Sequence, residues 1–464
     1  MNVINFDWLM VFFVHEITMY RKILNKILDS IERVGNGQRN CIRLVFDKLE
    51  ESNGKQKAKR VIIVYELEKG SDDLKEFYEF REIKTFSDWR TAILYVFDNV
   101  DAKRKAFFTW SHGAAFGINV SDLVQNKIEG FTQQEFTEDQ IVEVRNDQWY
   151  LPQSRLPEIS GFLKLSEDFN LGPDEYLVLP RDKEINCEKL VLIWMSDLAD
   201  VLSKVTKKCG KIDLMIMTNC NMMLFENGYM LRNNVDILIG SESKMWALGY
   251  DYEKLIIELN KPSQPDNEVL AKMIVKDYVD KHRRLGHNKY LARTSMFACR
   301  LSETEKIAEI LDSVTKSLLR QNSLMKDMVE LVRKVYLNSV SGVGTYFLVD
   351  LGLWIETIFA NLKSIGLDQN DLKQFRDIYE KIPLEQHVGA GYFADDQNGH
   401  KKYGHSGFSL FLPTDGLFME TRKYAWCAYS AQVQTVFKNE FMWDEFILKL
   451  TANEGFTDQL QVVS

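Results

Sequence analysis

The sequence predicts an α/β fold, in which a mostly parallel sheet is flanked by helices on both faces and an additional helical region follows toward the C-terminus. Three observations lead to this prediction. The 464 residues are 45% hydrophobic and include only 8 prolines, which suits a large core without long disordered linkers. In the first half, short apolar runs alternate with segments of helical periodicity, as a parallel sheet requires. In the second half, helical periodicity dominates.

Strands and helices alternate over the first 110 residues. The elements expected here, in order, are a strand at 8–14, a helix at 20–34, strands at 41–46 and 61–65, a helix at 87–100 and a strand at 106–110. Gly35 is a typical helix end, and Ser87 is a typical helix start. The last strand runs directly into His112 and Gly113.

An irregular segment interrupts this pattern. Residues 118–186 have no clear period and contain four prolines, so we expect an insertion there. Regular elements then return as a helix at 195–207, a strand at 212–217, a helix at 221–232 and a strand at 235–239. The strand at 212–217 ends just before Cys220.

The remaining sequence is expected to be mainly helical. Helices are predicted from 302, where Ser302 and Glu305 resemble a capping box, and at 324–338, 351–364 and 369–381, and a late strand is predicted near 406–412. We therefore expect an α/β domain over 1–260 and a mainly helical region over 261–464.

Two of the expected strands end in groups that suit catalysis. One ends at His112 and Gly113, and the other ends at Cys220. Open α/β sheets place their sites beyond the carboxyl ends of the strands, so these groups would share one crevice if the strands are neighbours. A thiol and an imidazole together are suited to nucleophilic acyl transfer. A structural role for both is the alternative, because free cysteine is among the most buried residue types.

Several segments follow one another in a recognisable order. Apolar strands lead into His112-Gly113 and into Cys220, Glu226 and Tyr229 come six and nine residues after the cysteine, and later segments are Ser241-Glu242, Gly249-x-x-Tyr252, Val349-Asp350-Leu351 and Gly407 to Pro413. In this order the segments resemble the clostripain family of caspase-like cysteine peptidases. The resemblance covers residues from about 8 to 415.

The resemblance implies a caspase-like sheet and a cysteine endopeptidase with a protein or peptide substrate. Cys220 would be the nucleophile and His112 the general acid, and the backbone N–H groups of Gly113 and Cys220 would form the oxyanion hole. Self-cleavage within 118–186, or a regulatory protein partner, would control activity. Some members depend on calcium, but this sequence has no Asp-rich calcium loop, so we expect no cofactor and leave calcium open.

The sequence departs from the family just before the cysteine. The family usually has an aspartate two residues before it, which binds a basic substrate side chain. This chain has Thr218 and Asn219 instead, so the pocket they would line lacks that charge. Glu242 or Asp251 could supply it from the next strand and loop. The change also motivates a second hypothesis, an inactive caspase-like scaffold that binds a protein partner.

Composition excludes several other classes. The formal net charge of −9, without a block of Lys or Arg, argues against nucleic acid as a partner. No apolar run reaches the roughly 18 residues of a membrane span. The six cysteines are scattered without a CxxC pair, which favours reduced thiols over disulfides or zinc. If Met1 is the natural start, these features predict a cytoplasmic protein.

Overall fold

A computed structural model gives the fold of the chain. The residues that it describes are 5–16, 21–34, 39–50, 59–67, 74–80, 86–98, 100–113, 117–119, 192–242, 245–291, 294–320, 327–328, 331–332, 348–361, 369–389, 407–412 and 440–452. The predicted insertion at 118–186 lies outside these ranges except for residues 118 and 119, and most of the helix expected at 324–338 also lies outside them.

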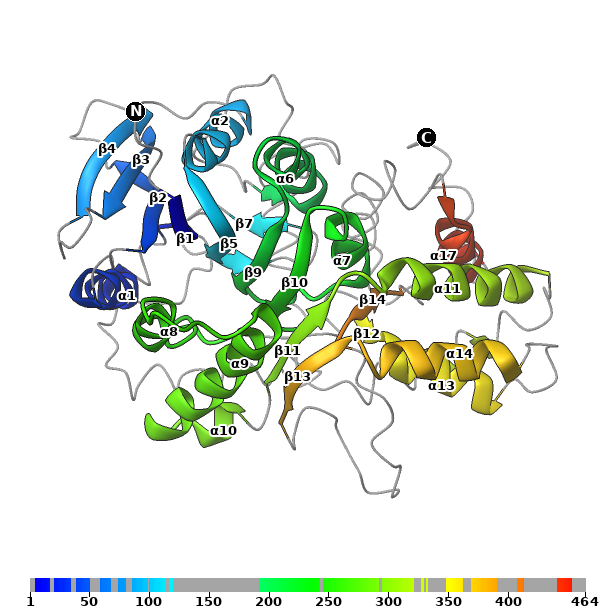
Figure 1. The fold of residues 1–464 in the computed structure, drawn as a ribbon. Coiled ribbons are helices and arrows are strands. Elements are labelled where there is room, and N and C mark those ends of the chain that lie inside the picture. Colours follow the sequence, from blue (N-terminus) through cyan, green and yellow to red (C-terminus); the bar gives the residue numbers. More distant parts are fainter. Residues whose placement is uncertain are drawn as a thin grey trace, which may run out of the picture.

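A nine-stranded sheet forms the centre of the described molecule (Figure 1). In spatial order its strands are β13 (Pro383–Val388), β11 (Ser295–Arg300), β10 (Val235–Gly240), β9 (Ile212–Thr218), β5 (Asp101–Trp110), β1 (Asn5–His15), β2 (Asn40–Glu50), β3 (Lys59–Leu67) and β4 (Leu74–Phe80). The five strands from β10 to β2 pair in parallel. Only β11 and β3 run in the opposite direction, so the predicted mostly parallel sheet is confirmed.

The continuous apolar runs of the central strands reflect burial on both faces of the sheet. In β1, residues 8–14 are at most 2% exposed, and alternate side chains enter two separate cores. Leu9, Val11 and Phe13 face one core, whereas Met10 and Phe12 face the other. A strand covered on both sides has no polar face, so its sequence shows no alternation.

Helices cover both faces of the sheet, as predicted (Figure 1). One core is closed by α1 (Arg21–Val34), α8 (Tyr252–Leu259) and α9 (Asn267–Arg284), with α10 (Asn288–Leu291) following α9. The other core is closed by α2 (Phe86–Phe97), α6 (Met195–Cys209) and α7 (Phe225–Leu231). None of the helices in the described ranges is long and apolar enough to cross a bilayer.

A helical group lies beside the β10–β13 edge of the sheet (Figure 1). It consists of α11 (Thr304–Leu319), α13 (Leu351–Asn361), α14 (Gln369–Tyr379) and α17 (Trp443–Ala452), with the short pair β12 (Leu348–Asp350) and β14 (Ser409–Phe411). The late strand predicted near 406–412 is therefore present as β14. Strands β11 and β13 also come from beyond residue 260, so the sheet draws on both of the expected segments.

The predicted capping box at Ser302 is wrong. Helix α11 begins at Thr304, its N-cap is Glu303, and no side chain caps it. The Thr304 hydroxyl instead donates a hydrogen bond to the backbone carbonyl of Leu301. Ser302 thus lies in the turn that leads from β11 into the helix, one residue before the N-cap.

Candidate active site

The site lies where β5 and β9 end side by side. These strands are parallel neighbours in the sheet, and Trp110 at the end of β5 is paired with Thr218 at the end of β9. The backbone N–H of Ser111 continues the contact by donating to the Thr218 carbonyl at 3.4 Å. The expectation that both strands open onto one edge of the sheet is confirmed, because paired parallel strands end at the same edge.

The segment after β5 packs directly on Cys220. A side-chain Cβ added at Gly113 would lie 1.9 Å from the carbonyl oxygen of Cys220 and 2.7 Å from its backbone nitrogen. Only glycine fits such a close approach between two backbones. His112 and Gly113 form the short strand β6, which pairs with β7 (Gly117–Asn119), and β7 pairs in turn with β8 (Leu192–Trp194). The imidazole of His112 lies outside what the structure describes.

The Cys220 side chain is half-buried, and its thiol is free. The backbone N–H of Met245 donates to its sulfur at 3.2 Å, and the thiol lies 3.7 Å from the Met245 carbonyl oxygen. The next residue, Asn221, has φ 58°, a left-handed conformation that asparagine tolerates better than most residues. This turn redirects the chain from β9 toward α7 and leaves Cys220 at the strand end.

The structure places Thr218 and Asn219 in the interior. Thr218 is 4% exposed, and its hydroxyl shares a hydrogen bond with the Tyr252 hydroxyl at the start of α8. Asn219 is 1% exposed; its side chain accepts from the Thr109 hydroxyl and donates to the Ser111 carbonyl at 3.0 Å. Asn219 therefore ties the ends of β5 and β9 together. A substrate contact by either residue stays a prediction.

Glu242 and Asp251 occupy different surroundings. Glu242, just after β10, is completely buried. Burial raises the pKa of the Cys299 thiol on β11, and the nearby Glu242 carboxylate raises it further. Asp251 caps α8 by accepting from the backbone N–H of Lys254, and it pairs with Arg284 of α9 at 2.9 Å. It also lines a cavity of about 480 Å³ between α1, α8 and α9. A contact between either of these carboxylates and a basic substrate side chain stays a prediction.

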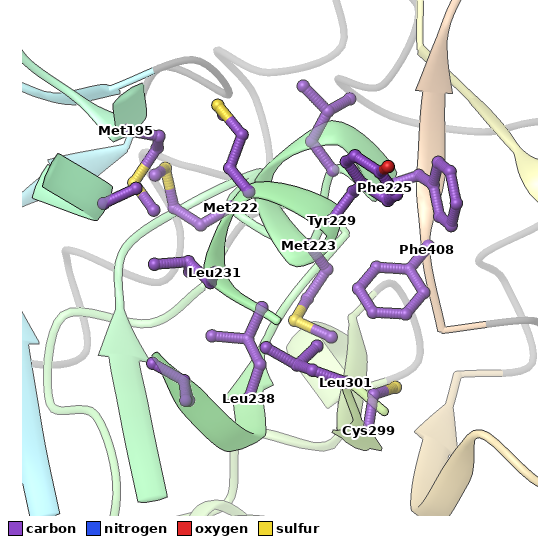
Figure 2. Packing of buried hydrophobic residues seen from close by; sticks show 14 of the residues in the cluster. Met195, Met222, Met223, Phe225, Tyr229, Leu231, Leu238, Cys299, Leu301 and Phe408 are labelled. Atoms are coloured by element: carbon purple, nitrogen blue, oxygen red, sulfur yellow. The ribbon is translucent and has the colours of Figure 1, made fainter. Parts of the chain in front are cut away.

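Strand β14 and the residue just after β10 hold the turn that follows Cys220, called the cysteine turn. Met223 donates its backbone N–H to the Ser241 carbonyl at 3.2 Å and accepts from the Ser409 N–H of β14 at 2.8 Å. The Phe225 ring packs edge-on against Phe408, with centroids 5.9 Å apart. Figure 2 shows Met223 lying among these rings and Leu301. The chain after Cys220 is thus fixed to the sheet and to β14.

Sequence reasoning missed the segment 245–250, which contacts the sulfur. In addition to Met245, this segment offers the Ala247 carbonyl, which accepts from the Trp110 indole N–H at 2.7 Å. Its only signal in the sequence is the Gly249-x-x-Tyr252 step, where Gly249 has φ 57° and leaves no room beside Thr218 for a side chain. Within the described ranges, no three His, Cys, Asp or Glu side chains converge as metal ligands would.

Comparisons with known proteins bear on the family and the fold of this chain. A model of the clostripain family matches residues 186–450, which is more than half of the chain. The fold resembles a secreted C11 cysteine protease from Bacteroides thetaiotaomicron in complex with an irreversible peptide inhibitor, with 13% identity, 92% of this chain and 99% of that chain covered, and a TM-score of 0.50. A second structure from that organism, a secreted C11 cysteine protease called iotapain, gives 12% identity, 96% and 99% coverage, and a TM-score of 0.52. No curated protein matches the sequence.

Proposed function

The chain belongs to the clostripain family of cysteine peptidases, and on this premise we propose that it is an endopeptidase in which Cys220 and His112 form the catalytic dyad. The observation that carries the proposal is the contact between the Gly113 and Cys220 backbones. His112 immediately precedes Gly113, so this contact brings the backbone of the proposed general acid to the nucleophile although 107 residues separate the two in sequence.

The proposed reaction proceeds in two steps. The Cys220 thiolate attacks the scissile carbonyl and forms a carbon–sulfur bond, while the negative charge moves to the carbonyl oxygen. The backbone N–H groups of Gly113 and Cys220 stabilise that oxyanion. The His112 imidazolium gives its proton to the departing amine as the carbon–nitrogen bond breaks. Water, deprotonated by the neutral imidazole, then hydrolyses the thioester and releases the acid and the thiol.

The proposed substrate is a protein or peptide whose residue before the scissile bond need not be basic. Thr218 is uncharged, and its hydroxyl is engaged by Tyr252. The carboxylate of Asp251 is held by Arg284. A guanidinium that entered beside Thr218 would lose water without gaining a partner charge there, which disfavours arginine. We therefore expect an uncharged side chain to be preferred.

Labelling and cleavage assays test the dyad. A panel of peptide probes with electrophilic warheads, covering basic, acidic and uncharged side chains, should label the wild-type protein. Cys220→Ala and His112→Ala should abolish both labelling and cleavage of a peptide library. Cys209→Ala, which removes another half-buried free thiol, should change neither. If no probe of the panel labels the wild type, the inactive scaffold that binds a protein partner is the better description.

Control by self-cleavage is the second part of the proposal. The segment 118–186 separates the two proposed catalytic residues, so a cut within it would leave each of them on a separate piece of the chain. Intact masses should show a cut within this segment in the wild type and an uncut chain in Cys220→Ala. Equal, uncut masses for both proteins under activating conditions would leave a regulatory protein partner as the proposed control. A cytoplasmic location and activity without a cofactor also stay proposals, with calcium dependence left open.

A further inference from the structure

One short segment lies in contact with the sulfur of Cys220. Residues 245–250, called the Met245 segment below, place the Met245 N–H 3.2 Å from the sulfur. The segment is tightly turned, because the Gly249 N–H donates to the Trp246 carbonyl at 2.9 Å. It has no regular secondary structure and therefore needs contacts from elsewhere to keep its shape.

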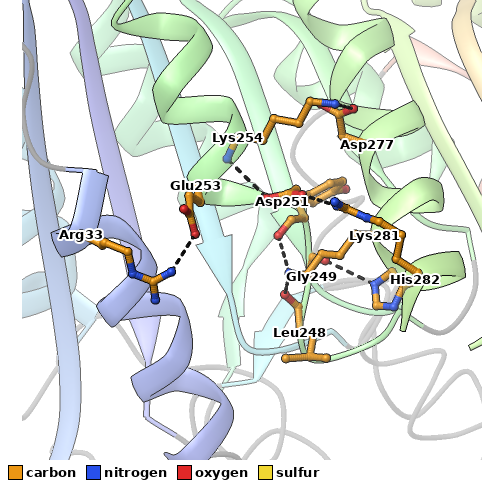
Figure 3. A network of polar contacts seen from close by, with 11 residues as sticks. Arg33, Leu248, Gly249, Asp251, Glu253, Lys254, Asp277, Lys281 and His282 are labelled. Atoms are coloured by element: carbon orange, nitrogen blue, oxygen red, sulfur yellow. Dashed lines mark hydrogen bonds and ion pairs between the residues drawn. The ribbon is translucent and has the colours of Figure 1, made fainter. Parts of the chain in front are cut away.

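Two neighbouring side chains of α9 supply those contacts (Figure 3). The Lys281 ammonium donates to the carbonyl of Leu248 at 2.9 Å and to that of Tyr250 at 2.8 Å. The His282 ring hydrogen-bonds the carbonyl between them, that of Gly249, at 3.3 Å. Three successive carbonyls of the Met245 segment are thus held by consecutive residues of one helix.

Lys281 holds the Met245 segment through backbone carbonyls and not through a carboxylate. Burial lowers the pKa of Lys281 to about 8, and the two hydrogen bonds from its ammonium to the Met245 segment go to neutral carbonyl groups. Lys254, on the neighbouring helix α8, instead forms an ion pair with Asp277 of α9. Lys254 links two helices at the surface, whereas Lys281 links a helix to the segment that contacts Cys220.

We propose that Lys281 is a positioning residue for Cys220. By clamping the carbonyls of Leu248 and Tyr250, it fixes the turn of the Met245 segment and keeps the Met245 N–H directed at the sulfur. An N–H that donates to sulfur favours the thiolate over the thiol, and the thiolate is the reactive form. The inference rests on the proposed role of Cys220 as the nucleophile.

Alkylation of Cys220 tests the proposal. The full chain is treated with iodoacetamide between pH 5 and 10, and modification of each cysteine is followed by peptide mass. In Lys281→Met, the rate–pH profile of Cys220 should move up by about one pH unit, and the rate at neutral pH should fall about tenfold, as expected when one hydrogen bond to a charged group is lost. Lys254→Met, the matched control, should keep the wild-type profile.

Cys41 and Cys299 report whether the fold survives, because both are buried and react only after unfolding. With both protected, an unshifted Cys220 profile in Lys281→Met overturns the proposal. If Lys281→Met exposes them, Lys281→Gln is measured in its place by the same criterion. Exposure of both cysteines in both variants also contradicts the proposal, since Lys281 would then hold the whole fold and not one segment.

The experiment is independent of peptidase activity. Iodoacetamide reacts with a thiolate whether or not the protein cleaves peptides. A shifted profile together with peptide cleavage that survives Cys220→Ala would support the positioning role and refute the proposed nucleophile. An unshifted profile together with cleavage that requires Cys220 would do the reverse.

Discussion

Glu226 carries a buried carboxyl group six residues after Cys220, in the first turn of α7. Its side chain is 1% exposed, and neither carboxyl oxygen has a hydrogen-bond partner of ordinary geometry among the described residues. Burial raises its pKa to about 8, and the nearby backbone N–H groups of Glu226 and Phe411 oppose this only in part. The protein therefore holds this carboxyl protonated at neutral pH.

Folding stability should depend on pH through this group. In the unfolded chain the carboxyl has a pKa of 4.5, so between pH 4.5 and about 8 the folded protein keeps a proton that the unfolded chain has lost. The free energy of unfolding then falls as pH rises through this window. The difference between 4.5 and about 8 corresponds to about 5 kcal/mol well above pH 8, and to about 4 kcal/mol at pH 8, where the folded carboxyl is half-titrated, at 1.36 kcal/mol per pKa unit.

Replacing Glu226 with Gln removes the titration while keeping the shape of the side chain. We expect the free energy of unfolding of Glu226→Gln to resemble that of the wild type at pH 4.5 and to exceed it by about 2 kcal/mol at pH 6 and about 4 kcal/mol at pH 8. Guanidinium unfolding at a series of pH values, followed by tryptophan fluorescence, measures both curves. Glu253→Gln is the matched control, because this carboxylate pairs with Arg33 at the surface, where ion pairs are worth about 0–1 kcal/mol.

Two outcomes would contradict a protonated Glu226 in the folded protein. If the stability curves of the wild type and Glu226→Gln run parallel from pH 4.5 to 8, Glu226 does not hold a proton in the folded state. A loss of stability in Glu226→Gln at pH 8 would be equally damaging, because it would mean that the charged form is favoured in place. In either case a partner for the carboxylate would have to exist next to α7.

Three further changes probe the same region. Gly113→Ala places a methyl carbon within 1.9 Å of the Cys220 carbonyl oxygen, so kcat/KM for peptide cleavage should fall about 100-fold, as for a misplaced reacting group. Tyr252→Phe leaves the buried Thr218 hydroxyl without this partner, and denaturant titration should show a loss of about 1–3 kcal/mol. Between pH 8 and 10.5 the unfolded chain binds a proton at Lys281 that the folded protein has lost, so wild-type stability should rise by about 3 kcal/mol relative to Lys281→Met, measured by unfolding across that range.

The central strands could be predicted from sequence because their burial leaves a direct pattern. Strands β1, β5 and β9 appear as unbroken apolar runs, since both of their faces are covered. The strands β4, β11 and β13 were not predicted. β13 begins with a proline and is only half-buried, and β4 mixes charged and aromatic residues. Such strands are stabilised by antiparallel pairing with a neighbouring strand. A local sequence pattern does not contain the information about that pairing.

The candidate site could be predicted only to the level of the strand ends. The positions of His112 and Cys220 after apolar runs place both residues at one edge of the sheet, and the pairing of β5 with β9 confirms that these strands end side by side. It does not tell which way Thr218 and Asn219 point. The structure turns Thr218 toward Tyr252 and Asn219 toward Thr109, so both serve the framework in the described contacts. Side-chain direction at a strand end depends on the turn that follows, here at Asn221.

The cysteine turn is held by segments that lie far from it in sequence. β14 contacts Met223 from one side, and the Met245 segment contacts the sulfur from the other. All of these supports lie within the part of the chain that matches the clostripain family, residues 186–450. His112 and Gly113 lie outside that part, before the 118–186 segment, and reach Cys220 through β5 and the close backbone contact. The contacts at Met223 and at the sulfur therefore come from one portion of the chain, whereas the proposed general acid depends on how the other portion docks against Cys220. The proposed cut in 118–186 should therefore change how His112 and Gly113 dock on Cys220 and leave the contacts of Met223 and Met245 unchanged.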